Sequence, residues 1–282
     1  MDPLAEQAVD AVGEIFGRHP GRRAVHAKGT VCAGAFTATP AAARLTRAVH
    51  MQGERVPVTV RFSNASGDPD APDALPDGRG MATKLYLPDG SRTDIVAVTA
   101  ERFFARTPEE FVEFNRAVRR SENGPPRPDP VRMLWYLARH PKAAPAVAAL
   151  RKATATPSYA RRRYNGLHAF RWIDAEGGVR HVRYSWLPEE GEATLPADEA
   201  KTRPPDYLQR DLADRFAAGT TIRFTLELSS LDTNREREGD VLVFDPTRVT
   251  DGIELTDDPI LNFRPKAYSV SVDRRTRVPA GA

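Results

Sequence analysis

The stretch FRPKAYSVSVDRR, residues 263–275, places a phenol four residues after a guanidinium, Tyr268 after Arg264. Proline is tolerated in the first turn of a helix, so Pro265 predicts a helix from Lys266, with Arg264 near its cap and Tyr268 one turn on. A phenol titrates near ~10 and is neutral at pH 7, and an adjacent fixed cation is one of the few ways to hold it as phenolate. A phenolate is a hard ligand for ferric iron. Because such pairs also stack on ordinary helix surfaces, the two residues alone leave both interpretations open.

Periodic hydrophobic patterns predict the elements that must position these side chains. Apolar residues recur at helical spacing over residues 4–16 and predict an amphipathic opening helix. Alternating patterns predict strands at 57–63, 82–87, 94–98, 168–173, 179–187 and 221–229, and helical patterns occupy 40–52, 108–120, 130–150 and 205–218. The strands lie too close together for crossover helices, so an antiparallel sheet or barrel is favoured over a parallel sheet.

Three segments rich in glycine, proline or aspartate have some features of ligand-binding loops or linkers. GDPDAPDALPDGRG (67–80) is rich in Asp but lacks the glutamate that closes an EF-hand loop, so it predicts a rigid surface loop. GRGMATK (78–84) has the wrong spacing between glycine and lysine for a phosphate loop. GPPRPDP (124–130) predicts a stiff linker between two helical stretches, and no change of composition across it indicates a domain boundary.

The charge balance argues against a nucleic-acid partner. Lysine and arginine total 41 against 38 for aspartate and glutamate, a formal charge of +3 in a chain of 282 residues. The most basic stretch, RRRYNGLHAFR from Arg161, continues into Trp172 and Ile173, which is typical of a solvated strand entrance. We therefore expect no nucleic-acid binding.

The cysteine content and the hydropathy pattern indicate a cytoplasmic protein. Cys32 is the only cysteine, which excludes an intrachain disulfide and any metal site built from cysteines. No run approaches the ~18 apolar residues of a membrane span, and the acidic start lacks the basic region of a secretory signal. We expect no membrane partner.

Several histidines and aromatic residues have no chemical context in the sequence. His19, His50, His140 and His181 are predicted to be dispensable surface or strand residues. Trp135, Trp172 and Trp186 are predicted to be core or groove aromatics, and Cys32 an inert buried thiol.

Four N-terminal segments occur in an order that identifies a family. They are RRAVHAKGTVCAGAF (22–36), VTVRFSNASGD (58–68), DGRGMATKLYLPDG (77–90) and DIVAVTAERFFARTPEEF (94–111), and DGIELTDDPIL precedes Arg264 and Tyr268. Over residues 20–276 the chain resembles the haem catalase family, and its short length makes it similar to the small catalase-related peroxidases. The resemblance implies an α+β fold with an antiparallel β-barrel core and surrounding helices. It also implies one haem b-binding domain over residues 1–282, with the helix in 1–19 and the tail 277–282 peripheral, and no bound NADPH.

The family pattern, carried over residue by residue, assigns the site. His26 would be the distal histidine, with Ser63 behind it and Val25 against the haem face. Tyr268 would be the proximal iron ligand. The relay behind Tyr268 would be Arg264, His168 and Asp258; Arg23, Arg61 and Arg275 would bind the propionates, and Phe103 and Phe111 would pack on the haem.

One position departs from the family pattern. Catalases place an asparagine on the distal face, and this chain has Val98 there with Thr99 beside it. Valine cannot hydrogen-bond to peroxide, and losing one preorganised donor commonly costs ~10² to 10³ in rate, so dismutation should be impaired. Thr99 would compensate only if the strand shifted its register.

The resemblance thus implies a peroxidase that uses peroxide to oxidise small organic donors, with weak catalase activity. A hydroperoxide isomerase or dehydratase, or a biosynthetic haem oxidase of the same fold, is the alternative, and a haem carrier without enzymatic activity is a third. A homodimer is the expected assembly.

Overall fold

The computed structural model describes residues 2–119, 126–230, 235–238 and 247–276. Its main feature is a sheet of ten strands in which every pairing is antiparallel. The strands are β1 (Gly29–Phe36), β2 (Val56–Asn64), β3 (Arg79–Tyr86), β4 (Arg92–Val98), β7 (Tyr164–Asn165), β8 (Phe170–Ile173), β9 (Val179–Pro188), β10 (Phe224–Ser230), β11 (Arg235–Glu238) and β12 (Ile253–Leu255). The α+β class predicted from the sequence is confirmed.

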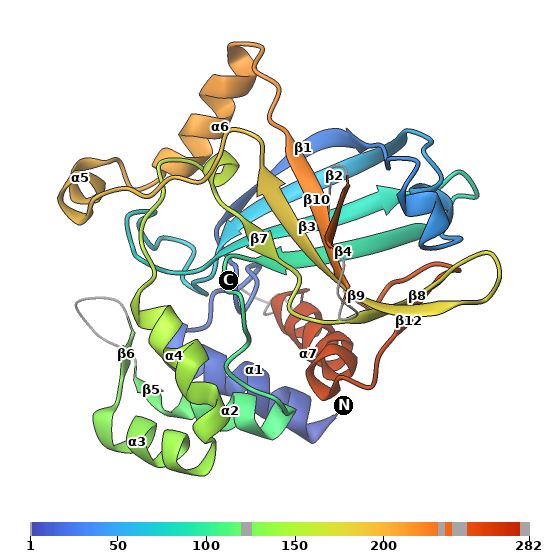
Figure 1. Cartoon of the computed structure of the whole chain (residues 1–282). Coiled ribbons are helices and arrows are strands. Elements are labelled where there is room, and N and C mark those ends of the chain that lie inside the picture. Colours follow the sequence, from blue (N-terminus) through green and yellow to red (C-terminus); the bar gives the residue numbers. More distant parts are fainter. Residues whose placement is uncertain (1, 120–125, 231–234, 239–246, 277–282) are drawn as a thin grey trace.

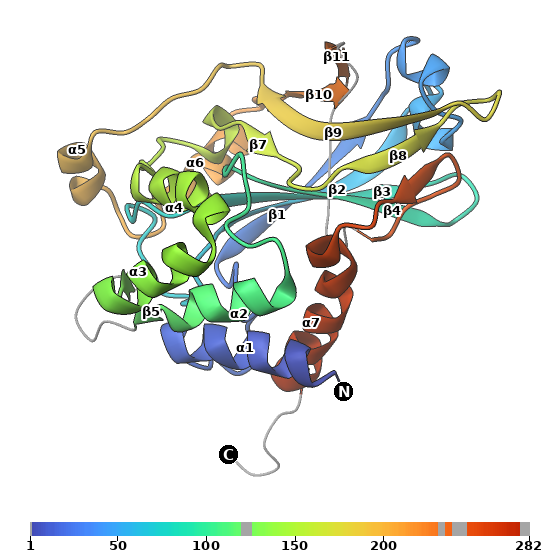
Figure 2. The same ribbon diagram turned by 60° about the horizontal axis from the view of Figure 1, so that its bottom comes forward.

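The sheet runs in the order β1, β2, β3, β4, β7, β9, β10, β11, with β8 beside β9 and β12 beside β8. Among the described residues no pairing joins β1 to β10 or β11, so hydrogen bonds do not close the expected barrel. Figure 2 shows β1 to β4 as one layer with β8 and β9 across from it. The two layers enclose a single large core whose biggest members, Trp172 and Trp186, are fully buried as predicted.

Seven α-helices are described: α1 (Pro3–Phe16), α2 (Pro108–Arg116), α3 (Pro130–Arg139), α4 (Ala144–Arg151), α5 (Ala197–Thr202), α6 (Tyr207–Ala217) and α7 (Pro259–Thr276). Side-chain oxygens of Asp2, Thr107 and Asp129 cap the N-termini of α1, α2 and α3. Helices α1, α2 and α7 lie together against one side of the sheet (Figure 2), where they bury the small residues Ala5 and Ala8. No helix in the described part of the chain is long and apolar enough to cross a membrane.

The predicted bounds of two helices are wrong. Residues 40–52 form only two 3-10 turns, Ala42–Arg44 and Val49–Met51, because the Arg47 backbone N–H donates to Ile173 and the Thr46 hydroxyl donates to the Gly252 carbonyl. Residues 130–150 are divided into α3 and α4 at His140, where Pro141 cannot continue the hydrogen-bond ladder.

The segment 124–130, predicted to be a stiff linker, contains a short β-strand instead. Arg127–Pro128 (β6) pairs with Val118–Arg119 (β5) in a small second sheet, so this segment folds back on the end of α2. The rest of the linker that precedes Pro126 lies outside the described residues, as does the tail 277–282.

Helix α7 begins at Pro259, well before the predicted start at Lys266. Asp258 accepts from the Ile260 and Leu261 backbone N–H groups, so it caps the helix, and Pro259 occupies the first turn. Pro265 lies inside the helix, and Arg264 is therefore a mid-helix residue instead of a cap.

Three single-residue predictions about burial need correction. His50 is 1% exposed and packs on Phe36 instead of lying at the surface. Trp135 is 67% exposed instead of lying in the core or a groove. Cys32 is only half-buried, and its partial burial raises the pKa of its thiol to about 11, so it stays protonated at neutral pH.

Candidate functional site

His26 lies in the loop between α1 and β1, with its ring fixed against the sheet. Its φ of 53° is left-handed, which is uncommon for a residue with a Cβ and is held here by the His26 N–H bond to the Ala65 carbonyl. Nδ1 lies 3.0 Å from the Ser63 hydroxyl on β2. Among the described residues Nε2 has no hydrogen-bond partner, so this nitrogen is available to a substrate.

Gly80 on β3 provides the space that the His26 ring occupies. A Cβ at this position would lie 2.8 Å from the Ser63 hydroxyl oxygen and 3.0 Å from both Cε1 and Nδ1 of His26. Gly80 was not among the site residues predicted from the sequence. It could have been found as a glycine inside a strand pattern, because such a glycine often marks the close approach of another group.

His26 is uncharged at neutral pH. Loss of hydration in the interior lowers the pKa of its imidazole to about 3, and the positive charges of Arg61, Arg264 and Arg23 add to the shift. The ring can therefore accept a proton across the physiological range.

Arg264 and Tyr268 meet on α7 as the four-residue spacing predicts. The Arg264 guanidinium donates to the Tyr268 oxygen from Nε at 2.9 Å and from a terminal nitrogen at 2.5 Å. Both hydrogen bonds are charge-assisted, so the position of the Tyr268 oxygen is firmly fixed by Arg264.

The other side of Arg264 contacts the predicted relay. A guanidinium nitrogen of Arg264 lies 3.1 Å from His168 Nε2, and His168 Nδ1 lies 2.6 Å from Asp258. Since arginine can only donate, Nε2 accepts, and Nδ1 carries the proton that it donates to the carboxylate. The sequence-predicted set Asp258, His168, Arg264 and Tyr268 is thus one continuous hydrogen-bonded chain.

The pKa shifts in the relay agree with this protonation. Burial lowers the pKa of His168 and the Arg264 charge adds to the effect, although the Asp258 bond opposes both. Burial raises the pKa of Asp258, but the hydrogen bond from His168 and the backbone N–H groups of α7 outweigh it and lower the pKa overall. The relay therefore pairs a neutral imidazole with a carboxylate.

The distal loop and the proximal helix border the same region. The Ala24 backbone N–H, two residues before His26, donates to the Ser271 hydroxyl, three residues after Tyr268, at 3.4 Å. The Arg264 charge also acts on the His26 ring. The loop that carries His26 thus lies against α7, the helix of Arg264 and Tyr268, and the two border one region between the sheet and α7.

The predicted propionate-binding arginines have different surroundings. A terminal nitrogen of Arg61 donates to the His26 carbonyl at 2.7 Å, so this buried guanidinium also holds the distal loop in place. Arg23 is half-buried and near enough to lower the pKa of His26. Arg275 falls in α7, but its side chain lies outside the described residues. Val25 is half-buried beside His26.

Phe103 and Phe111, the two residues predicted to pack on the haem, lie next to each other. Their rings stack with centroids 6.1 Å apart, and Phe104 contacts both rings. Phe111 also packs on the apolar cluster of α1, α2 and α7, so it lies near the helix that carries Tyr268.

Val98 faces the same side of the sheet as His26. Ser63, Gly80 and Val98 are directly opposite one another on β2, β3 and β4, and cross-strand partners share a face. The strand keeps this register, and the Thr99 hydroxyl oxygen accepts from the Arg79 backbone N–H at 3.0 Å. The neighbour opposite Val98 is Asn165 on β7, a polar residue that the sequence analysis did not identify.

The residues of this region fit a haem group. No group of three or more histidine, cysteine, aspartate or glutamate side chains in the described residues could hold a bare metal ion. The Tyr268 phenol oxygen is fixed by two hydrogen bonds from Arg264, and a single phenol oxygen is a ligand of the kind that haem iron accepts. The arginines near His26 suit the two carboxylates of a haem, and the stacked phenylalanines suit its flat apolar ring.

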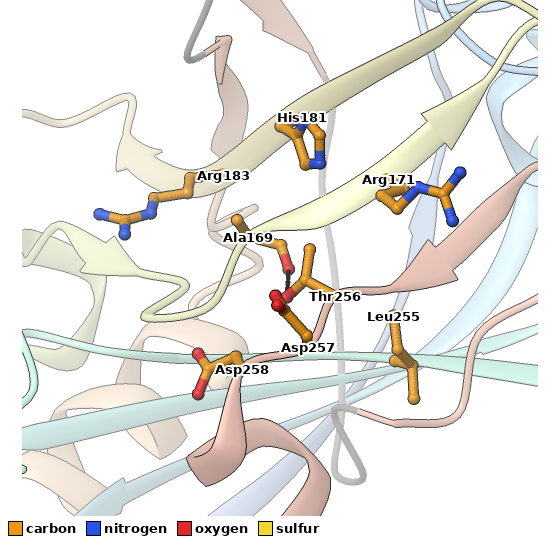
Figure 3. Close-up of a pocket in the computed structure, with 8 residues that line it drawn as sticks. All are labelled: Ala169, Arg171, His181, Arg183, Leu255, Thr256, Asp257 and Asp258. Atoms are coloured by element: carbon orange, nitrogen blue, oxygen red, sulfur yellow. Dashed lines mark hydrogen bonds between the residues drawn. The ribbon is translucent and has the colours of Figure 1, made fainter. Parts of the chain in front are cut away.

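A surface hollow of about 490 Å³ lies behind the relay, lined by residues in and next to β8, β9 and β12 and by the chain before α7. Figure 3 shows these residues. Asp258 lines the hollow, and the Thr256 hydroxyl donates to the Ala169 carbonyl across it. Its lining includes neither His26 nor Tyr268, so it is separate from the region between the sheet and α7.

Comparisons with known proteins agree with this arrangement. A family model described as Catalase matches residues 17–255. A catalase-related peroxidase of Mycolicibacterium paratuberculosis is 43% identical over 98% of this chain and 96% of its own length. A catalase-related peroxidase of Synechococcus elongatus is 30% identical over 96% of this chain and 88% of its own. A solved bacterial catalase superposes with a TM-score of 0.74 at 22% identity; the match covers 94% of this chain and 61% of the catalase, and supports the fold alone.

Proposed function

Because this chain belongs to the catalase family, we propose that it is a haem-dependent peroxidase that oxidises small organic donors with hydrogen peroxide or an organic hydroperoxide and retains weak catalase activity. The observation that carries the proposal is the double hydrogen bond from Arg264 to the Tyr268 oxygen, supported by His168 and Asp258. A haem carrier would have no need of a phenol oxygen held in this way. We propose haem b as the cofactor, without a nicotinamide partner.

Haem iron, when bound, supplies the Lewis acid and the electrons needed to cleave the peroxide bond. Tyr268 would hold the group from the α7 side, and Arg264 would keep negative charge on the phenol oxygen. The arginines near His26 would meet the carboxylates, and the stacked phenylalanines would cover the ring.

The protein's own part in the reaction is proton transfer by His26. Nε2 takes a proton from the bound peroxide and returns it to the leaving oxygen, so one ring serves as base and then as acid. The low pKa of His26 leaves the ring unprotonated at neutral pH, and the Ser63 contact at Nδ1 stops it from rotating away.

Val98 favours donor oxidation over dismutation. Its isopropyl group lies on the His26 face beside Gly80, at the position where an amide donor is expected. The same lack of a donor motivates a second candidate, a hydroperoxide isomerase or dehydratase, which needs no reducing donor.

The test is donor oxidation by the haem-loaded protein. We expect a phenolic dye to be oxidised by peroxide much faster than by the same concentration of free haemin, and equality with haemin would reject a peroxidase. Fatty-acid hydroperoxides consumed without any reducing donor, with a rearranged product in the mass spectrum, would favour the isomerase.

Replacing Val98 with Asn tests the distal face separately. Oxygen release from peroxide should rise about tenfold or more, because a preorganised donor is commonly worth ~10² to 10³ in rate, while dye oxidation should change less. An unchanged oxygen rate would mean that Val98 does not limit dismutation.

A further inference from the structure

The α3 helix carries an apolar stripe that the rest of the described chain leaves uncovered. Val131, Leu134 and Trp135 are 65%, 69% and 67% exposed, and Ala138 continues the stripe. At 100° per residue these four lie on one face, since they fall at spacings of three, four and seven. The opposite face, with Met133 and Tyr136, is buried.

The inner face of α3 is firmly anchored, so the outer face is not the result of a poorly packed helix. The Tyr136 hydroxyl donates to the Phe104 carbonyl at 2.7 Å, and its ring meets Phe114 edge-on at 5.5 Å. The helix starts at the Asp129 cap. An exposed tryptophan and leucine on a stable helix indicate a surface that interacts with another molecule.

The stripe continues into a groove between α3 and α4. Leu137 lies one turn after Leu134 and borders a groove of about 280 Å³, whose floor also includes Ala144, Val147 and Ala148. Arg151 and Lys152 form its rim. The groove and the stripe together make one apolar surface, which we call the α3–α4 face.

The charged side chains of α3, α4 and the chain around them are mostly cationic, although Arg139 pairs with Glu113 of α2 at 3.5 Å. Residues 126–152 contain six cationic side chains, all exposed: Arg127, Arg132, Arg139, Lys142, Arg151 and Lys152. The only acidic residue of this segment, Asp129, is buried and caps α3. Lys142, Arg151 and Lys152 have no ion-pair partner among the described residues.

This charge decides between possible occupants. A second copy docked on the same face by two-fold symmetry would bring six cations against six, which costs free energy. An anionic lipid surface complements both features, since it offers negative head groups to the cations and an apolar interior to Leu134 and Trp135. Tryptophan is also the residue that prefers the boundary between head groups and acyl chains.

We infer that the α3–α4 face docks the protein on anionic membrane surfaces, with Val131, Leu134 and Trp135 inserted at the level of the head groups and the six cations on the phosphates. This surface is distinct from the region around His26 and Tyr268, and the inference does not depend on the proposed reaction. It differs from a membrane span, because the helix would lie in the plane of the surface.

The test is binding of the whole haem-loaded protein to vesicles. We expect co-sedimentation with vesicles of equal parts phosphatidylglycerol and phosphatidylcholine, and little or none with pure phosphatidylcholine. Leu134→Glu should weaken binding at least tenfold. Arg151→Glu with Lys152→Glu should weaken it by more than tenfold, because each basic side chain near an anionic leaflet contributes about fivefold.

Trp135 gives an independent readout, because Trp172 and Trp186 are fully buried. Anionic vesicles should shift the tryptophan emission to shorter wavelength and protect it from acrylamide. A Trp135→Phe variant should lose that signal while still sedimenting with the vesicles.

Matched controls separate this face from general stickiness. Val31 is 60% exposed and lies on β1, a strand that Figure 1 shows apart from α3, so Val31→Glu should bind like the parent. Lys201→Glu with Arg210→Glu on α5 and α6 makes the same change in net charge and should weaken binding less than the α4 pair.

Four results would overturn the inference. The first is no binding to anionic vesicles, and the second is equal binding by the Leu134→Glu and Val31→Glu variants. The third is a protein that dimerises until Trp135→Glu makes it monomeric, which would assign the face to a second copy. Capture by poly-glutamate that is insensitive to Leu134→Glu would likewise indicate a purely electrostatic partner.

Discussion

Replacing Gly80 with alanine tests whether the open space on β3 positions the distal histidine. The added Cβ would lie 3.0 Å from His26 Cε1 and Nδ1 and 2.8 Å from the Ser63 oxygen, whereas ordinary contacts begin at 3.4 Å. The ring would have to retreat by about 0.4 Å and the hydroxyl by about 0.6 Å, the differences between those distances. Both shifts point away from the new Cβ on β3.

The expected cost in rate follows from this displacement. A misplacement of 1 Å at a catalytic group can cost ~10²-fold, so a shift of roughly half that size should lower peroxide-driven dye oxidation by about tenfold or more. The cost in stability should be smaller, about 1–3 kcal/mol for overpacking, partly offset because alanine replaces a glycine inside a strand.

The assay compares kcat for dye oxidation with the urea unfolding midpoint, for the haem-loaded protein and two variants. Gly78→Ala is the matched control, because its Cβ would meet Ala65 at 3.4 Å and the Thr99 oxygen at 3.9 Å, both ordinary contacts. It should retain activity and stability. If Gly80→Ala kept the parent rate while remaining folded, the position of His26 would not depend on Gly80 and the reasoning would be refuted.

Two other changes test the relay and the buried histidine. Arg264→Lys keeps a cation but loses the planar guanidinium that reaches both Tyr268 and His168. Dye oxidation should therefore fall at least tenfold, and haem should transfer faster from the variant to apomyoglobin. Haem retention and activity equal to those of the parent would show that a positive charge alone suffices. Burial lowers the pKa of His50 from 6.5 to about 4, so its contribution to stability is complete above pH 6.5 and is lost as the pH falls toward 4, on the order of 3 kcal/mol in all. His50→Leu should therefore flatten the decline of the urea midpoint between pH 7 and 4.5, and a decline parallel to that of the parent would contradict this assignment.

Strands were predictable where apolar and polar residues alternate in the sequence. The alternation in 57–63, 94–98 and 179–187 reproduces β2, β4 and β9 to within two residues at either end, because successive side chains of a strand point to opposite faces. The two-residue β7 and three-residue β12 are too short to carry a pattern. Their pairing is decided by residues far away in the chain.

Helix limits were less predictable, because competing local signals had to be ranked. Pro265 suggested a helix start, but the Asp258–Pro259 pair is the better signal, since the aspartate caps two N–H groups and the proline follows in the first turn. In 40–52 the helical pattern was overruled by hydrogen bonds to Ile173 and Gly252, which local sequence cannot reveal.

The relay could be identified only through the family resemblance. His168 and Asp258 are separated by 90 positions, and nothing local to either residue indicates that they meet. The Arg264–Tyr268 pair, by contrast, follows from helical spacing alone. Gly80 was missed because a glycine in a strand indicates that something comes close, without indicating what.

One guanidinium links the two sides of the site. Arg264 donates twice to the Tyr268 oxygen, and its charge also lowers the pKa of His26. The same cation therefore holds the phenol oxygen on α7 and helps to keep the imidazole of His26 uncharged. A second cation at His168 would repel Arg264, and burial together with the Arg264 charge keeps that imidazole neutral, while Asp258 fixes which of its nitrogens accepts. The relay thus orients a single positive charge without adding another, and that charge serves both the Tyr268 oxygen and the uncharged His26 ring.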